Sequence, residues 1–406
     1  MTLSPKISNH NFYSFLWHAG FLALAQSFMD VDTIIPAMVI ESGGTAMHIG
    51  IMTAIMMGGS SFTQLFFAPY ISNKSFKKKF LLAGINVRVL SLFALALVLF
   101  LLNKSQPDLI LWLIFLFITM FALGGAFTNI SYNDILGKSI NENKRKAFFS
   151  AKQIIAGGIV LISAFLAKKV LTSGEYPLNF GYMFLIGATL LLIASGGFWK
   201  IKEQIPSALK ISGLNEYLTI LKSELKENKK LAYFLGFINT QGIIVSFLPF
   251  AMLYAKQTFD TQSADTGYFL LFKVVGIVII SLLVFVAAKK IKYNPLLYLN
   301  VLLSLTLIFT TLLVSESHSL RFVFILGGVV YSLFSITMNG LLLEVSGKEN
   351  RALYTGFAGA GNILPALFPL SGGLIINHFG FEVFFLLFVL IVATSVFFIF
   401  KINCKK

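Results

Sequence analysis

The chain has 406 residues, of which 57% are hydrophobic and only 12% are charged. Soluble domains carry roughly 25% charged residues, so this composition excludes an ordinary soluble protein. The net charge of +15 does not indicate nucleic-acid binding, because the cations lie in connections between apolar stretches and not in a basic domain. The single cysteine, Cys404, excludes a disulfide framework and a cysteine-based metal cluster.

Twelve long apolar stretches follow one another along the chain. A helix needs ~20 mostly apolar residues to cross the ~30 Å hydrocarbon core of a bilayer. The sequence therefore predicts an all-α membrane protein with twelve transmembrane helices, at 11–40, 47–71, 78–102, 108–139, 146–170, 180–200, 229–255, 263–288, 293–314, 319–346, 351–376 and 380–401.

The connections between these stretches are alternately rich and poor in Lys and Arg. With the N-terminus inside, 24 of the 32 cations lie in inner segments, five lie in outer segments and three lie within spans. Because basic loops stay on the cytoplasmic side, this bias predicts that both termini are cytoplasmic. We expect a multi-pass protein of the plasma (inner) membrane of a prokaryote.

The longest connection, 201–228, divides the chain into an N-terminal half (1–200) and a C-terminal half (229–406), each with six predicted spans. Its apolar residues recur at helical spacing among Lys and Glu: Leu214, Leu218, Leu221 and Leu225. This pattern favours an amphipathic helix on the inner membrane surface. The alternative is a plain charged linker.

Three local matches relate the two halves. Aligning Pro36 with Pro249 places Gln26 opposite Asn239, and the sequence Leu-Gly-Gly occurs at both 123–125 and 326–328. Downstream of each Leu-Gly-Gly, an acidic residue precedes a short basic turn and then small and aromatic residues. Internal similarity at about half the chain length predicts two structural repeats.

Six spans plus six, a long middle connection and cytoplasmic termini resemble the major facilitator superfamily. The turn between spans 2 and 3 reads PYISNKSFKKK. Lys77-Lys78 match the later basic pair of the family motif in this turn, while Asn73-Lys74 replace Asp-Arg and Pro69 replaces Gly. The resemblance implies a secondary transporter with its site between the halves at the membrane midplane. The Gly-Pro motif of drug/proton antiporters is missing from span 5, which reads Ala156-Gly157-Gly158.

Charges within spans are the first candidates for the site, because a charge at mid-bilayer costs ~2.5 kcal/mol or more unless it is paired or hydrated. Lys273, in span 8, is interpreted as an anion-binding or proton-coupling residue; the alternative is a structural ion pair. Asp30 and Asp32 in span 1 are ~200° apart on a helix, so they cannot both face one cavity. We favour Asp30, because it lies deeper. Arg88 is in span 3, which the family resemblance places at the periphery, so bracing of neighbouring helices competes with a substrate role.

Neutral polar residues at a similar depth complete a candidate substrate and coupling cavity. Each alone is more often a contact between helices, but together they predict a polar cavity. They are Gln26, Gln64, Asn129, Asn239, Gln241, Tyr331, Asn339 and Asn362.

Charges near the inner ends of spans 4, 5, 10 and 11 predict an inner gate. We expect Asp134 to pair with Arg351, and Glu344 with Lys152 or Arg145, in one transport state and to separate in the other. The alternative is ordinary charge at the membrane interface.

These features predict a monomeric transporter without cofactor or metal that moves a small organic solute, weakly favoured to be anionic or zwitterionic, by proton-coupled alternating access. The alternative is a multidrug or lipophilic-compound efflux protein of the same fold, which the buried Lys152 and Lys273 disfavour. An enzyme is not expected, because the five His are scattered and no nucleophile–base pair is evident.

Overall fold

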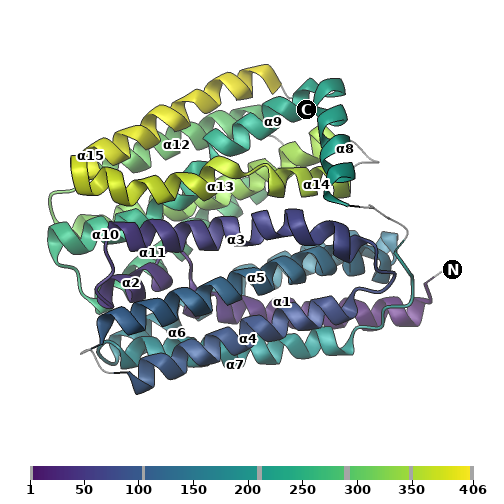
Figure 1. The fold of residues 1–406 in the computed structure, drawn as a ribbon, viewed down its shortest axis with the longest axis horizontal. Helices are drawn as coiled ribbons and strands as arrows, with labels where there is room; N and C mark the ends of the chain where they lie inside the picture. The colour runs from purple at the N-terminus through teal and green to yellow at the C-terminus, as the bar shows by residue number, and fades with distance from the viewer. Residues whose placement is uncertain (1–2, 103–105, 208–212, 288–292, 347–350, 403–406) are drawn as a thin grey trace. The chain divides into compact units, whose positions relative to one another are not determined.

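The computed structural model describes residues 3–102, 106–207, 213–287, 293–346 and 351–402. Within these ranges the chain is helical, and no strand occurs (Figure 1). It forms two compact units, one of Met1–Asp30 and Gly59–Leu218 and the other of Val31–Gly58 and Thr219–Lys406. The outer part of the first predicted span and much of the second therefore belong to the same unit as the last six spans.

The first unit is a bundle in which α4 packs on α5 and α7, and α1 packs on α6 and α7. The chain leaves α1 through a short 3-10 turn, η1. The helix α3 runs through both units. The bounds of these elements are α1 Pro5–Gln26, η1 Ser27–Met29, α3 Ala46–Ser72, α4 Lys78–Leu101, α5 Pro107–Ser139, α6 Glu142–Thr172 and α7 Leu178–Lys200.

In the second unit α11 and α12 pack on α13, while α9 and α12 pack on α15. The short α2 contacts α10 and α11. The elements are α2 Ile34–Glu41, α9 Lys229–Thr240, η2 Gly242–Ser246, α10 Phe247–Phe259, α11 Ser263–Ala287, α12 Tyr293–Leu313, η3 Ser317–Ser319, α13 Leu320–Ser346, α14 Arg351–Ala360 and α15 Ile363–Ile402.

The predicted all-helical membrane architecture is confirmed, and the helices are consistent with twelve spans. Among the described residues, nine helical stretches are long and apolar enough to cross a bilayer, and Ala46–Gly59 is a shorter apolar one. The element α15 contains two helices that meet at Gly380, whose φ of 81° and ψ of 175° only glycine adopts readily. Predicted spans 11 and 12 separate at this residue.

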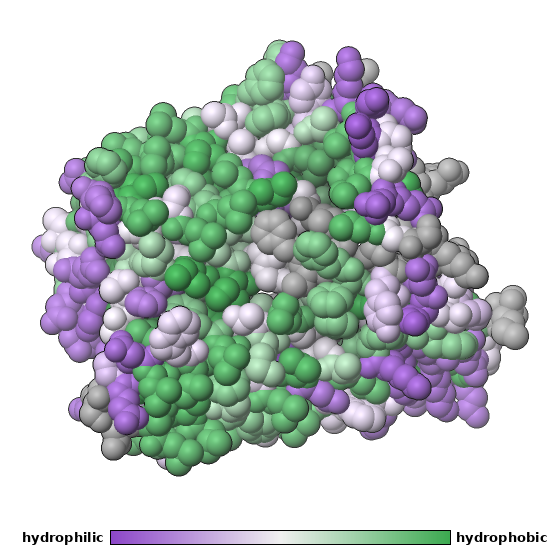
Figure 2. All heavy atoms as spheres, viewed as in Figure 1, coloured by the Kyte–Doolittle hydropathy of each residue, from purple (hydrophilic) through white to green (hydrophobic). Residues whose placement is uncertain are grey.

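Large apolar side chains are exposed on the outer faces of the helices, including Trp112, Phe285 and Leu390. On the face seen in Figure 2, hydrophobic side chains cover the middle of the helices, and hydrophilic side chains gather toward the helix ends. In water such a surface would be unfavourable, whereas hydrocarbon solvates it. This distribution is that of an integral membrane protein.

The first and seventh predicted spans are both interrupted at the positions that the repeat aligns. In the first, α1 ends at Gln26 and α2 begins at Ile34, with η1 and an extended Asp30 between them. In the seventh, α9 ends at Thr240 and α10 begins at Phe247, with η2 between them. Broken helices leave backbone groups available near mid-span, as in transporter sites.

The predicted helix in the middle connection forms as α8, Leu214–Glu227. Tyr217 is its buried residue, and burial raises the pKa of this phenol to about 12, so the side chain stays neutral. The Tyr354 hydroxyl at the start of α14 donates to Glu224 Oε2 of α8 at 2.6 Å. The placement of α8 on a membrane surface stays a prediction.

Candidate functional site

A buried ion pair connects α11 to the segment that precedes α2. Lys273 Nζ donates to Asp32 Oδ2 at 2.5 Å, and the two side chains are only 4% and 7% exposed. Both residues belong to the second unit. Each charge would be costly if left alone in such a buried place, so each side chain serves as the counter-ion of the other.

Close packing of α11 on α13 fixes the backbone that carries Lys273. A Cβ added at Gly328 would lie 1.9 Å from the Lys273 carbonyl oxygen, and one added at Gly276 would lie 2.0 Å from the Ile325 oxygen. Glycine at both positions lets the two backbones touch. The Leu-Gly-Gly sequence at 326–328 therefore contributes to the position of the buried lysine.

Tyr331 lies next to this lysine. Lys273 Nζ is 5.5 Å from the centre of the Tyr331 ring, and the ring is 41% exposed. The structure thus brings Lys273 and Tyr331, both predicted for the cavity, together within the second unit. Asp30 is half-buried and Gln26, the last residue of α1, is exposed. The structure pairs Lys273 with Asp32, whereas the sequence favoured Asp30 as the functional acid.

A second ion pair lies in the same unit. Lys256 Nζ, in α10, is 3.6 Å from Glu41 Oε1 at the end of α2 and 3.4 Å from Asp260 Oδ1. Lys256 and Glu41 are 27% and 21% exposed, so solvent screens this pair more than the Asp32–Lys273 pair. The sequence alone did not indicate it, because Glu41 and Lys256 both lie in the last turn of a helix, where a charged residue is common.

Asn239 connects two helix interruptions. Its Nδ2 donates to the Gly361 carbonyl at 2.6 Å, and its Oδ1 accepts from the Ile363 and Leu364 amides at 3.0 and 2.8 Å. It thus caps the start of α15 from the end of α9. Asn362 is half-buried in the same interruption, and its Oδ1 would be 3.5 Å from a Cβ added at Gly242.

Gln241 is completely buried and uses both ends of its amide within the helix bundle. Its Nε2 donates to Ser304 Oγ of α12 at 2.8 Å, and its Oε1 accepts from Ser395 Oγ of α15 at 3.2 Å. These contacts join three helices of the second unit. The geometry thus gives Gln241 a packing role, and the predicted contact with substrate stays a prediction.

In the first unit Lys152, predicted for the inner gate, contacts Tyr132 of α5. Lys152 Nζ donates to the Tyr132 hydroxyl at 3.4 Å, and the half-buried Lys152 lies 5.4 Å from the centre of the same ring. Arg88 stacks against Phe121, with its guanidinium carbon 4.1 Å from the ring centre, and the choice between bracing and a substrate role is left open by this contact. Asn129 is exposed. The side chain of Gln64 lies outside the described part of the structure.

Asp134, predicted for the inner gate, is held by two lysines of its own unit. Lys77 Nζ is 2.8 Å from Asp134 Oδ1, and Lys138 Nζ is 2.9 Å from Oδ2. The Ser207 hydroxyl also donates to Oδ2 at 2.7 Å. Lys77 belongs to the basic pair of the turn between spans 2 and 3. The altered turn motif therefore still binds this turn to α5.

Glu203 completes this network and was not identified from the sequence. Its oxygens accept from the backbone amides of Lys77 at 2.8 and 3.0 Å and from that of Lys78 at 2.8 Å, and one of them lies 2.7 Å from Lys138 Nζ. A carboxylate here satisfies free amides and opposes the positive end of the α4 dipole. The only available signal was a lone acid in a lysine-rich segment, which is too weak to predict a partner.

The other predicted gate residues lie at helix ends. Arg145 Nε donates to the Ile140 carbonyl at 3.1 Å, and a terminal nitrogen donates to the Gly137 carbonyl. Glu344 is half-buried near the end of α13. Arg351 is the first residue of α14, and its side chain lies outside the described residues. The expected pairs between halves stay predictions. No group of three or more potential metal-ligating residues occurs among the described side chains.

Comparison with known proteins identifies what this arrangement resembles. The family model described as "Major Facilitator Superfamily" matches residues 16–362. A mutant of the nucleoside transporter NupG superposes with a TM-score of 0.71 at 12% identity, covering 97% of this chain and 100% of that chain. A D-xylose–proton symporter gives 0.67 at 13% identity, with coverage of 97% and 98%. A POT family transporter in complex with a thioalcohol-conjugated peptide gives 0.68 at 14% identity, with coverage of 97% and 96%. No curated protein sequence matches the chain.

Proposed function

Because the chain belongs to the Major Facilitator Superfamily, we propose that this transporter moves a small organic solute, anionic or zwitterionic, by proton-coupled alternating access. At 10–14% identity the structural neighbours give the fold and not the substrate. These neighbours include nucleoside, sugar–proton and peptide transporters, so the fold accommodates polar organic solutes with and without charge.

The observation that carries the proposal is the buried Asp32–Lys273 pair. In a low-dielectric site a lysine needs an anion beside it. A substrate carboxylate or phosphate can take the place of Asp32, which leaves the site neutral overall if Asp32 accepts a proton. Protonation of Asp32 and substrate binding would therefore favour each other, which is the requirement for coupled transport.

Alternating access requires contacts that are made in one state and absent from the other. Asp134 is held by Lys77 and Lys138. We expect it to exchange these partners for Arg351 in the other state, with Glu344 taking Lys152 or Arg145. The network around the turn would then be part of the inner gate, on the side predicted to face the cytoplasm.

A ligand screen followed by flux measurement tests this proposal. Purified protein is screened by thermal shift against carboxylates, phosphorylated compounds, dipeptides, sugars, nucleosides and lipophilic cations, and any compound that raises Tm is then tested in proteoliposomes. We expect an acid or zwitterion to bind, and an imposed pH gradient to drive its uptake with a matching change of lumenal pH. Flux that ignores the gradient would contradict proton coupling. Binding of lipophilic compounds alone would favour the efflux alternative.

Two sets of variants connect the flux to the residues. Lys273→Ala should weaken substrate affinity and change the pH dependence of uptake, whereas Lys169→Ala, at an exposed site, should not. Unchanged affinity and pH dependence in Lys273→Ala would refute the central site. Asp134→Asn and Glu344→Gln should shift inward and outward accessibility in a cysteine-labelling assay, and unaltered labelling would refute the gate.

A further inference from the structure

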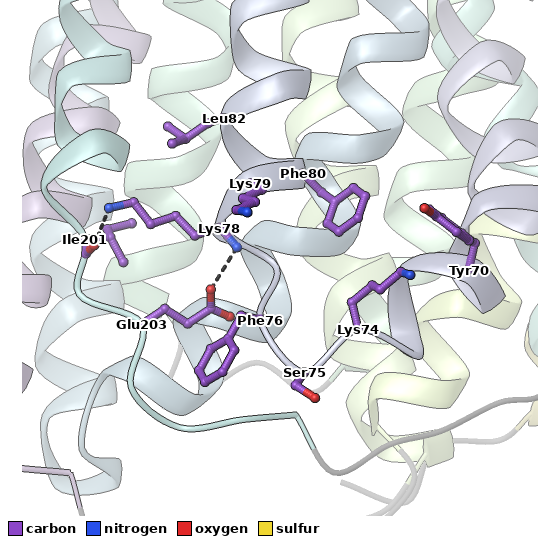
Figure 3. A pocket seen from close by; sticks show the side chains of 10 residues that line it. All are labelled: Tyr70, Lys74, Ser75, Phe76, Lys78, Lys79, Phe80, Leu82, Ile201 and Glu203. Carbon is purple, nitrogen blue, oxygen red and sulfur yellow. Dashed lines mark hydrogen bonds between the residues drawn. The ribbon is translucent and has the colours of Figure 1, made fainter.

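An open cavity of about 800 Å³ lies in the first unit, where α3 ends and α4 begins (Figure 3). Three lysines and three aromatic side chains line much of it: Lys74, Lys78, Lys79, Tyr70, Phe76 and Phe80. None of these residues belongs to the predicted transport site.

The cavity carries excess positive charge. Glu203 is the one acid among its described lining residues, and both of its oxygens are already occupied by the Lys77 and Lys78 amides and by Lys138. Lys74 and Lys79 are exposed, so their ammonium groups are accessible to a ligand. An anion entering the cavity would therefore meet two accessible cations and no uncompensated carboxylate.

Aromatic side chains also line the cavity, and two of them are exposed. Tyr70 and Phe76 are 54% and 53% exposed, and the Phe80 ring packs edge-on to Tyr70 with ring centres 5.9 Å apart. Lys74 Nζ lies 4.7 Å from the centre of the Tyr70 ring. A small inorganic anion would gain nothing from such a wall, whereas an amphiphile would cover it.

The position of the cavity along α4 indicates which class of amphiphile suits it. The apolar span formed by α4 begins at Lys78, so the cavity lies at the level where the hydrocarbon core ends. Leu82, one turn further into the span, also lines it. Phosphate headgroups lie at this depth, and the charge bias of the sequence places the turn on the cytoplasmic side. Basic pockets at this level suit anionic lipid headgroups.

We infer that this cavity binds the headgroup of an anionic phospholipid. Lys74 and Lys79 contact the phosphate, and the glycerol and the first acyl carbons cover Phe76, Phe80 and Leu82. The Lys78 side chain does not take part in this contact, because it donates to the Trp199 and Ile201 carbonyls at 2.8 and 2.7 Å. The inference is independent of the transported substrate. It implies that the lipid stabilises the turn between α3 and α4. Lys77, at the end of this turn, forms an ion pair with Asp134.

The test measures stabilisation by lipid of the full-length protein in a neutral detergent. Unfolding is followed while phosphatidylglycerol, phosphatidylcholine or soluble glycerol phosphate is added. We expect phosphatidylglycerol to raise Tm saturably and the other two to have little effect. Lys74→Gln/Lys79→Gln should require about tenfold more phosphatidylglycerol for the same shift. The matched control is Lys229→Gln/Lys230→Gln, which removes two exposed lysines from the start of α9 on the same predicted side and should behave as wild type.

Three outcomes would overturn the inference. The first is that phosphatidylglycerol stabilises the Lys74/Lys79 double variant as well as the wild type. The second is that phosphatidylcholine raises Tm as much as phosphatidylglycerol does. The third is that glycerol phosphate raises Tm as much as phosphatidylglycerol does, which would mark a site for a free anion. If the double variant is unfolded without lipid, the single variants Lys74→Gln and Lys79→Gln replace it, each with a smaller expected loss in the same direction.

Discussion

Lys273 and Asp32 form a buried ion pair although 241 residues separate them in the chain. The lysine comes from the middle of α11, and the aspartate comes from the interruption between α1 and α2. The pair therefore connects the first predicted span with the eighth, and its integrity depends on the break in the first span as well as on the charge of either residue.

Removal of one partner of this pair should destabilise the protein strongly. Lys273→Gln or Asp32→Asn leaves the other charge buried without a counter-ion, which costs about 3–5 kcal/mol. The double variant Asp32→Asn/Lys273→Gln removes both charges and should regain most of this loss. Chemical unfolding in detergent measures the free energies. Lys256→Gln is the control, because its half-exposed pair with Glu41 should contribute less than about 1 kcal/mol. If the double variant lost as much free energy of unfolding as the two single variants together, the two charges would not be coupled.

The second glycines of the two Leu-Gly-Gly sequences, Gly328 and Gly125, should respond differently to replacement by alanine. Gly328→Ala would place a Cβ 1.9 Å from the Lys273 carbonyl oxygen, so the helices must separate, at a cost of about 1–3 kcal/mol. Gly125→Ala meets no atom within 4 Å and should be neutral or stabilising by about 0.5–1 kcal/mol, because alanine favours a helix. Thermal unfolding of both variants measures the difference. Equal losses at the two positions would show that Gly328 is not a close contact.

The sequence was sufficient for the architecture but only partly for the site. Apolar length and the positions of Lys and Arg are one-dimensional properties, so they predicted the membrane helices and a buried role for Lys273. The pairing of Lys273 with Asp32 occurs beside an extended residue and a turn that interrupt the helix, whereas the ~200° argument assumed a continuous helix. A break of this kind has no periodicity to reveal it.

Asn239 and Glu203 illustrate the remaining limit. The sequence indicated Asn239 as a polar residue at the right depth. Besides one bond to the Leu235 carbonyl of its own helix, its bonds go to the backbone of residues more than 120 positions away. Glu203 bonds to amides 125 and 126 positions earlier. Such contacts depend on which helix ends meet in space, and a single sequence does not carry that information.

Glu203→Gln should loosen the start of α4. The neutral amide retains one acceptor oxygen but loses the charge that opposes the helix dipole and pairs with Lys138, so we expect a loss of about 0.5–2 kcal/mol. Hydrogen exchange at the Lys77 and Lys78 amides should accelerate, while exchange in α9 should stay unchanged. Glu227→Gln, at an exposed site on α8, serves as the control and should alter neither region. Unchanged exchange at Lys77 and Lys78 would refute the capping role.

The last prediction concerns the two helix interruptions that Asn239 connects. Asn239→Ala removes the Nδ2 donor to the Leu235 and Gly361 carbonyls and the Oδ1 acceptor that the Ile363 and Leu364 amides share. Loss of the cap on these two amides should cost about 1–3 kcal/mol.

Asn239→Asp keeps the acceptor for both amides but replaces the donor to the Leu235 and Gly361 carbonyls with a second acceptor. Its loss should therefore be concentrated in α9 and at the end of α14. Hydrogen exchange separates the two effects: the alanine variant should expose the start of α15, and the aspartate variant should leave it protected. Asn339→Ala is the matched control, because Asn339 is exposed and its side chain donates within its own helix, to the Ser335 carbonyl. Its effect should stay within about 0.5 kcal/mol. Equal exposure of α15 in the alanine and aspartate variants would show that the cap is not what holds these interruptions together.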